Sequence, residues 1–313
     1  MIIDLPSTTT AAINRSLVDL RESGGTVALG RVLTLVIATD ESSAEESIAA
    51  ANAASFEHPC RVLVVRSANG NGEPRMDAQI RVGGDAGASE AIVLHLHGEL
   101  AEHGAAVAVP LLLPDAPVVV WWPERAPAVP GADPLGVLAQ RRITDIGHAP
   151  RPAQALAARL AGYRPGDTDL AWTRLTLWRG LLAAALDQPP AEAVTSAEVS
   201  GAANSASADL LAGWLALKLN CPVTRSDSGE PGTGLHSVVM HRTSGPIALT
   251  RPEDNTATLT APGQPERRVA LPRRSLRDCI AEELRRLDAD EVYADVLRFG
   301  LPRVHRTVSD GRP

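Results

Sequence analysis

Apolar runs alternate with amphipathic segments through the first half of the chain. Residues 32–38 and 60–65 are continuous apolar runs rich in β-branched side chains, a pattern that predicts buried strands. Between them, residues 40–56 show helical spacing with acidic residues in the first turn, where the helix dipole favours them. The same reasoning predicts a helix over 7–22, strands over 79–82, 91–97 and 117–122, and short helices over 135–141 and 153–160. Strand, helix and strand in this order predict a layered α/β domain with a mixed sheet and crossover helices.

The second half has a different rhythm, in which helices precede a run of short strands. Helical spacing predicts helices over 167–186 and 207–219, with Asp167 as the N-cap of the first. Turn residues then separate short apolar segments, which indicates an antiparallel meander. The remaining predicted elements are strands over 193–199, 235–242, 246–251, 256–261 and 267–272, and helices over 275–287 and 290–299. This half is therefore predicted to be an α+β domain.

Length and composition favour two ordinary globular domains. At about 100–200 residues per domain, 313 residues favour two, and a charged fraction of 21% argues against a disordered chain. We expect an N-terminal α/β domain over 1–160, a C-terminal α+β domain over 161–302 and a flexible tail over 303–313. The net charge of -7 disfavours general binding to nucleic acid or to an anionic membrane.

The sequence carries no clear targeting signal and no cysteine pattern typical of a metal or redox site. No apolar run reaches the roughly 18 residues of a membrane helix, and the N-terminus lacks a secretory pattern, so a cytoplasmic location is expected. Cys60, Cys221 and Cys279 stand far apart without metal-type spacing, which favours buried thiols in a reducing compartment. One distant disulfide between two of them remains an alternative.

Catalytic motifs are also weak. His95 and His97 would share one face of a strand, and with Glu99 they could bind Zn²⁺ or Fe²⁺. The alternative is that they form the polar face of a strand whose other face is apolar. Glycine-rich segments at 82–87 and 228–234 lack the Lys-Ser/Thr of a phosphate-binding loop and are expected to connect strands. We therefore expect no metal, no cofactor and no catalytic residue.

Signals for an interface are stronger, because tryptophan and arginine are enriched at binding hot spots. Trp121 and Trp122 end a strand, so one ring is expected to face inward and the other outward or sideways. Plain core packing is the alternative to an interface role for these aromatic side chains. Arg141 and Arg142 precede Asp145, and such a pair can hold phosphate or carboxylate or make ion pairs at a domain junction.

Four stretches in order carry a resemblance to a known family. They are His58-Pro-Cys-Arg-Val-Leu-Val-Val, Leu111-Leu-Leu-Pro-Asp-Ala-Pro-Val-Val-Val-Trp-Trp-Pro, Gln140-Arg-Arg-Ile-Thr-Asp and Tyr163-Arg-Pro-Gly-Asp-Thr-Asp-Leu-Ala-Trp-Thr-Arg-Leu-Thr-Leu-Trp-Arg. With them the chain resembles the glucose-6-phosphate dehydrogenase assembly proteins, the OpcA family, in the form typical of actinobacteria.

The resemblance implies a non-catalytic partner of glucose-6-phosphate dehydrogenase. Such a partner promotes the active oligomer of the enzyme or activates it allosterically, in the oxidative pentose phosphate pathway that makes NADPH. Thioredoxin control through cysteines, known in some photosynthetic members, is not expected because this chain lacks a close cysteine pair. The candidate partner-binding residues are Trp121, Trp122, Arg141, Arg142, Arg174 and Arg179.

Two alternatives remain open. One is a metal-dependent enzyme that uses His95, His97 and Glu99, or a sugar-phosphate enzyme that uses Arg141 and Arg142. The other is a regulatory subunit that senses a sugar phosphate or a nucleotide.

Overall fold

The chain forms two compact units, each built from several segments. The structure is a computed structural model that describes residues 1–24, 32–40, 44–67, 72–82, 90–228, 234–252 and 255–307. Unit 1 contains Met1–Pro150, Arg164–Thr168 and Ser275–Ala289. Unit 2 contains Arg151–Tyr163, Asp169–Arg274 and Asp290–Pro313. Both units therefore take residues from either side of position 160, the boundary expected from the sequence.

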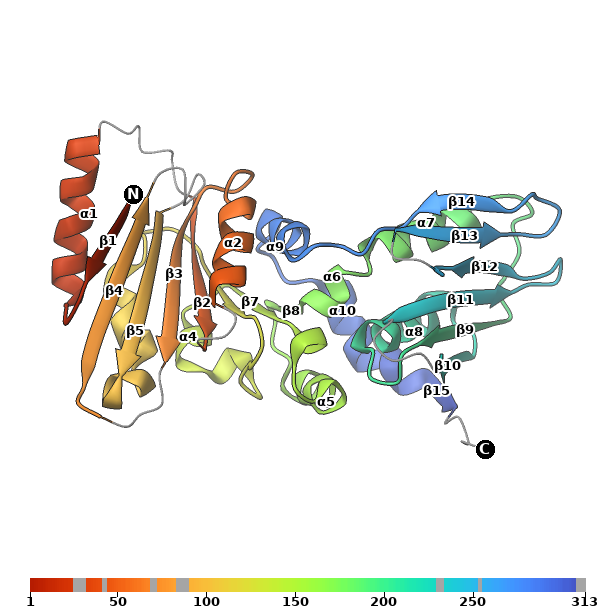
Figure 1. Ribbon diagram of the computed structural model, residues 1–313. Helices are drawn as coiled ribbons and strands as arrows, with labels where there is room; N and C mark the ends of the chain where they lie inside the picture. Colours follow the sequence, from red (N-terminus) through yellow and green to blue (C-terminus); the bar gives the residue numbers. More distant parts are fainter. Residues whose placement is uncertain are drawn as a thin grey trace. The chain divides into compact units, whose positions relative to one another are not determined.

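An eight-stranded mixed sheet forms the centre of unit 1 (Figure 1). Its strands are β1 (Ile2–Leu5), β2 (Leu33–Thr39), β3 (Cys60–Ser67), β4 (Arg75–Val82), β5 (Glu90–His97), β6 (Val118–Trp122), β7 (Arg141–Thr144) and β8 (Asp167–Asp169). They lie in the order β1-β4-β5-β3-β2-β6-β7-β8. The run β5-β3-β2-β6-β7 is parallel, whereas β4 pairs antiparallel with β5 and with β1. The predicted mixed sheet is therefore present.

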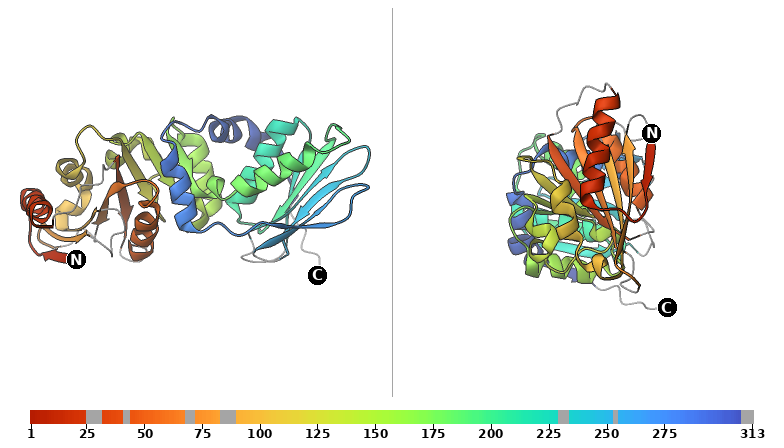
Figure 2. Two further views of the ribbon diagram at one scale, coloured as in Figure 1. Left: turned by 90° about the horizontal axis from the view of Figure 1, so that it is seen from above. Right: turned by 90° about the vertical axis from the view of Figure 1, so that its left-hand side faces the viewer.

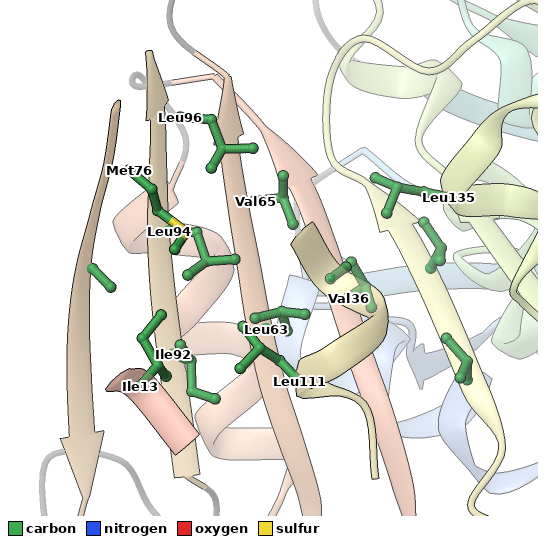
Figure 3. Packing of buried hydrophobic residues seen from close by; sticks show 14 of the residues in the cluster. Ile13, Val36, Leu63, Val65, Met76, Ile92, Leu94, Leu96, Leu111 and Leu135 are labelled. Atoms are coloured by element: carbon green, nitrogen blue, oxygen red, sulfur yellow. The ribbon is translucent and has the colours of Figure 1, made fainter. Parts of the chain in front are cut away.

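Helices cover both faces of this sheet. One face carries the hydrophobic cluster of Figure 3, in which Ile13 and Leu111 pack on Val36, Leu63 and strand neighbours. The helices on this side are α1 (Thr10–Gly24), α3 (Gly104–Ala108) and α4 (Pro134–Val137), with the short 3-10 turns η2 (Gly98–Glu102) and η3 (Val109–Leu111). Alternation turns the neighbouring strand residues to the opposite face, which α2 (Ala44–Ala54) covers together with α9 (Leu276–Arg285). The burial of both faces explains why the central strands are continuous apolar runs.

A seven-stranded mixed sheet forms the centre of unit 2. Its strands are β9 (Ser196–Gly201), β10 (Val223–Asp227), β11 (Leu235–His241), β12 (Ile247–Thr250), β13 (Thr256–Thr260), β14 (Arg267–Ala270) and β15 (Val304–Thr307). The order is β14-β13-β12-β11-β9-β10-β15. Strands β11 to β14 pair antiparallel in succession, which is the expected meander (Figures 1 and 2). Strand β10 is parallel to both of its neighbours.

The helix α8 (Ala206–Leu219) packs on β9 and β10 and forms the apolar centre of unit 2. It begins at Ser205, whose Oγ accepts from the backbone N–H of Ala208 at 3.2 Å, and ends at Asn220 in the left-handed region. The other helical elements are α5 (Pro152–Gly162), α6 (Leu170–Thr173), α7 (Thr176–Leu186), α10 (Glu291–Asp295), the π-helical η6 (Val296–Gly300) and the 3-10 turn η7 (Leu301–Arg303).

An ion-pair cluster around the buried Asp209 joins β10 and β15 at the edge of this second sheet. Arg225 donates from Nε to Oδ1 of Asp209 at 3.1 Å, and Arg306 on β15 donates to Oδ2. Burial raises the pKa of the Asp209 carboxyl, although both arginines act in the opposite direction. The segment Val304–Thr307, expected in a flexible tail, is therefore a strand held by backbone pairing and by charge.

Three local predictions are wrong for identifiable reasons. The helix predicted to reach Arg141 ends at Val137, and the arginine begins β7. The helix predicted from 167 begins only after β8, because Asp169, not Asp167, is its N-cap and accepts from the backbone N–H of Ala171. It is also interrupted between α6 and α7. Residues 83–87 and 229–233 of the glycine-rich segments, and 308–313 of the tail, lie outside the described residues.

Candidate functional site

The arginine pair on β7 is buried in unit 1 and paired with carboxylates. Arg141 donates to Oε2 of Glu283 on α9, from Nε at 3.1 Å and from Nη2 at 2.5 Å. Its Nη1 donates to the backbone carbonyl of Asp288 at 2.5 Å. Arg141 is 5% exposed, so its side chain has little surface left for an external anion.

Arg142 points to the other face of β7 and is also enclosed. Its Nε donates to Oδ1 of Asp167, and its Nη1 donates to the carbonyl of Ala139 at 2.8 Å. Asp167 in turn accepts from the backbone N–H of Arg164 at 2.8 Å. Of the two uses that the sequence allows for this pair, the structure shows internal ion pairs, and both lie within unit 1.

Trp121 and Trp122 end β6 and are both buried. Trp121 is 0% exposed and Trp122 is 4% exposed. Trp122 belongs to the same hydrophobic cluster as Val36 and Leu63, and alternation places Trp121 on the opposite face of the sheet. The expectation of an outward ring is wrong, because β6 lies between β2 and β7 in the middle of a covered sheet.

The second pair of candidate arginines lies in unit 2, next to an aromatic cluster. The guanidinium of Arg179 stacks over the Trp172 ring, 3.8 Å from its centroid. The indole N–H of Trp172 donates to Oδ2 of Asp290 at 2.8 Å, and Tyr293 packs beside the ring at 5.9 Å between centroids. Trp172 is 1% exposed, whereas Arg174 and Arg179 are half-buried. These two arginines are thus the members of the predicted set that keep some contact with solvent.

The two histidines of β5 share one face, as their spacing predicts. Each of them contacts a different charged side chain, and the two do not share a set of metal ligands. His95 lies 3.5 Å from Nη1 of Arg66, and His97 lies 3.2 Å from Oδ2 of Asp77. Glu99 lies on η2 and is exposed. Among the described residues, no three His, Cys, Asp or Glu side chains are placed to hold a metal ion together.

Asp77 also ties the N-terminal segment to β4. Its Oδ1 accepts from the backbone N–H of Ser7 at 2.8 Å, and Arg75 donates to its other oxygen at 3.1 Å. The hydrogen bond from Ser7 is the main reason why the pKa of Asp77 is lowered, and Arg75 and His97 add to it. His97 is thus in contact with the carboxylate that holds the N-terminal segment against β4.

Two exposed apolar side chains on packed elements of unit 2 were not predicted from the sequence. Phe299 on η6 is 54% exposed, and Leu160 on α5 is 38% exposed. The two elements pack together, and Arg298 lies over the Tyr163 ring at 5.1 Å from its centroid. We call Leu160, Tyr163, Arg298 and Phe299 the α5–η6 surface. No signal in the sequence indicates this exposure, because the other phenylalanine, Phe56, is exposed as well.

These features define a class: an α/β protein of two compact units, with Arg141 and Arg142 paired inside unit 1 and exposed apolar side chains on unit 2. Two family models match the chain. Residues 51–161 match the N-terminal domain of a glucose-6-phosphate dehydrogenase subunit, and residues 165–297 match the C-terminal domain of that subunit. The chain belongs to the OpcA family, as its sequence motifs indicate.

No curated protein matches the chain. In the described part of the structure, no helix combines the length and the apolar character that crossing a membrane requires. The cysteines are buried at positions 60 and 279 and half-buried at 221, and all three are thiols.

Proposed function

We propose that this chain binds glucose-6-phosphate dehydrogenase as a non-catalytic subunit and promotes its active oligomer in the oxidative pentose phosphate pathway. The family supports this proposal, because both matching models are named for a subunit of that enzyme and occur in order along the chain. The cytoplasmic location expected from the sequence is part of the same proposal.

The candidate contact surface is argued from one observation, the exposed side chain of Phe299 beside the Arg298–Tyr163 stack. An aromatic side chain left in water costs free energy, which burial against a partner recovers. Aromatic and arginine side chains are also the residues in which binding energy concentrates. The α5–η6 surface places both kinds together on one unit.

The six residues predicted from the sequence divide into two groups under this proposal. Arg174 and Arg179 are half-buried and remain candidate contacts. The others, Trp121, Trp122, Arg141 and Arg142, are at most 7% exposed, so they would support the fold behind an interface. Their removal would test stability more than binding.

Allosteric activation is the mechanism we propose for the effect on the enzyme. An activator must bind one state of its target more tightly than another, and a difference of about 1–3 kcal/mol shifts the balance roughly 5–150-fold. The catalytic chemistry then stays with the dehydrogenase, and this chain changes only the population of its active state.

Mixing the purified chain with glucose-6-phosphate dehydrogenase from the same organism tests the proposal. Co-elution on a sizing column together with a higher initial rate at subsaturating glucose 6-phosphate is expected. Co-elution without a change in rate would support binding and contradict activation. Separate elution with an unchanged rate would contradict the partner itself.

Matched substitutions then test the surface. Leu160→Ala and Phe299→Ala should each weaken binding by about 2 kcal/mol, roughly 30-fold, because they truncate candidate hot spots. Leu177→Ala on α7 is the control for Leu160→Ala, since both leucines are 38% exposed. Equal binding by all three variants, with unchanged folding, would move the interface elsewhere on the chain.

A further inference from the structure

A cavity of about 360 Å³ lies at the carboxyl ends of the parallel strands in unit 1. The ends of β2, β3 and β6 form its base, and η2, α3 and α4 form its walls. The volume falls in the range of roughly 300–1,000 Å³ that is typical of small-molecule sites. Val65 and Leu135, both buried apolar residues that line it, are labelled in Figure 3.

The topology explains why a cavity forms at this place. After β2 the chain leads to α2 on one face of the sheet, whereas after β6 it leads to α4 on the other face. Strands β2 and β6 are adjacent and parallel, so the two connections diverge and leave a crevice between them. Open α/β sheets bind their ligands at such a point, where the strand order reverses. The order β5-β3-β2-β6-β7 reverses between β2 and β6.

The lining is half apolar and half polar, and its charge is mainly negative. Trp122, Val65 and Leu135 give it an apolar floor. The polar side chains around this floor are Thr39, Asp40, Ser67, Glu102, Glu124, Arg125 and Asp133. Carboxylates only accept hydrogen bonds when ionised, so this rim favours a ligand that carries hydroxyl groups.

A phosphorylated ligand fits the site poorly. The sequence that follows β2, Thr39-Asp-Glu-Ser-Ser, contains no glycine, unlike the glycine-rich sequences that cradle a pyrophosphate. The acidic side chains outnumber the single arginine of the rim and would repel phosphate. A ligand with a flat apolar ring and a neutral group rich in hydroxyls matches the lining better, since the ring suits the apolar floor and the hydroxyls suit the acidic rim.

We propose that this cavity binds a nucleoside, with the base on the apolar floor and the ribose hydroxyls donating to the carboxylates. Carboxylates recognise ribose hydroxyls in the same way at other sites on open α/β sheets. This cavity shares no residue with the α5–η6 surface, and the proposal does not rest on binding to the dehydrogenase. Its failure and the failure of the proposed function are therefore distinguishable.

Isothermal titration calorimetry of the full chain with adenosine, guanosine, cytidine and uridine tests the proposal. We expect saturable binding of at least one nucleoside with a Kd below about 1 mM. The corresponding 5′-monophosphate should bind more weakly, because its phosphate meets the acidic rim. Absence of binding by all four nucleosides, or tighter binding of the monophosphate, would overturn the proposal.

Paired variants locate the binding in this cavity. Ala105→Leu fills the cavity from α3 and should abolish binding, whereas Ala106→Leu, on the exposed side of the same helix, should not change it. Glu124→Gln on the rim should weaken binding at least about tenfold through loss of a charged hydrogen-bond acceptor. Glu99→Gln, an exposed glutamate outside the lining, is its control. Binding that is insensitive to Ala105→Leu and Glu124→Gln would place the nucleoside elsewhere and overturn the assignment.

Discussion

Arg141 shows how much one buried charge depends on its partner. Its guanidinium reaches Glu283 with two donors and Asp288 with a third, and the glutamate is itself 4% exposed. Removing two charges from water is costly, and the pair offsets this cost only while both partners remain. The pair therefore contributes to the positioning of α9 within unit 1.

Truncation of that glutamate should be strongly destabilising. Glu283→Ala leaves Arg141 buried without its counter-charge, and we expect a loss of about 3–5 kcal/mol in the free energy of unfolding. Glu57→Ala is the control. Glu57 pairs at 3.5 Å with Arg285, which lies on α9 like Glu283, but both side chains of this pair are more than half exposed. It should cost at most about 1 kcal/mol in urea denaturation. Equal losses for the two variants would contradict the role of burial.

Asp77 gives a prediction for the dependence of stability on pH. Its pKa is lowered below 3.8, so the folded state favours the carboxylate. The contribution to stability is fully present above the unfolded pKa and is lost as the pH falls through the lowered folded value. Asp77→Asn should therefore lower the Tm at pH 6, and the difference from wild type should shrink as the pH falls below 3.8. A difference that grows toward acid would contradict the assignment.

The kinds of residue at the candidate site could be predicted, but their exposure could not. Spacing placed His95 and His97 on one face, and motif order identified the family. The burial of Trp121 depends on strands and helices far away in sequence, which local alternation does not describe. The counter-charge of Arg141 lies 142 positions further along the chain, so no local pattern could indicate it.

At the scale of the element, long periodic segments were predicted well and short ones were not. The apolar runs of β2 and β3 and the stripe of α8 match their predicted positions closely. Strands β7, β8 and β15 have three or four residues, and sheet neighbours, not their own composition, make them extended. Strand β10 was missed because it directly follows a helix and a proline turn.

The crossing of α8 and η6 relies on two glycines in contact. A Cβ on Gly300 would meet the backbone oxygen of Gly213 at 2.3 Å, which is too close for any side chain. Gly300→Ala should therefore force the elements apart and cost about 1–3 kcal/mol. Gly180→Ala on α7, where the added methyl has no neighbour within 4 Å, should stabilise the chain by about 0.5–1 kcal/mol through helix propensity. Thermal unfolding of both variants checks the contrast, and a neutral Gly300→Ala would contradict it.

At the scale of the whole molecule, the chain leaves each compact unit and returns to it. Helix α9 packs on α2, although more than two hundred positions separate their first residues. Its sequence neighbours β14 and α10 belong to unit 2. Folding of the two units is thus linked through the covalent path of the chain.

Hydrogen exchange can test which unit α9 belongs to energetically. Under mildly denaturing conditions the backbone amides of α9 should open with the same free energy as those of α2, and with a different one from those of β13. The physical reason is that α9 has its packing and its ion pair in unit 1. Amides of α9 that exchange together with β13 would contradict this grouping.

The return of Ser275–Ala289 to unit 1 has a consequence for synthesis on the ribosome. The nascent chain exposes the uncovered side of α2 and the uncompensated Arg141 until α9 emerges. At about 5–20 residues per second, the roughly one hundred residues between the last two segments of unit 1 take about 5–20 s to add. The N-terminal segments of unit 1 therefore stay incomplete, and accessible to chaperones, while the residues of unit 2 are synthesised.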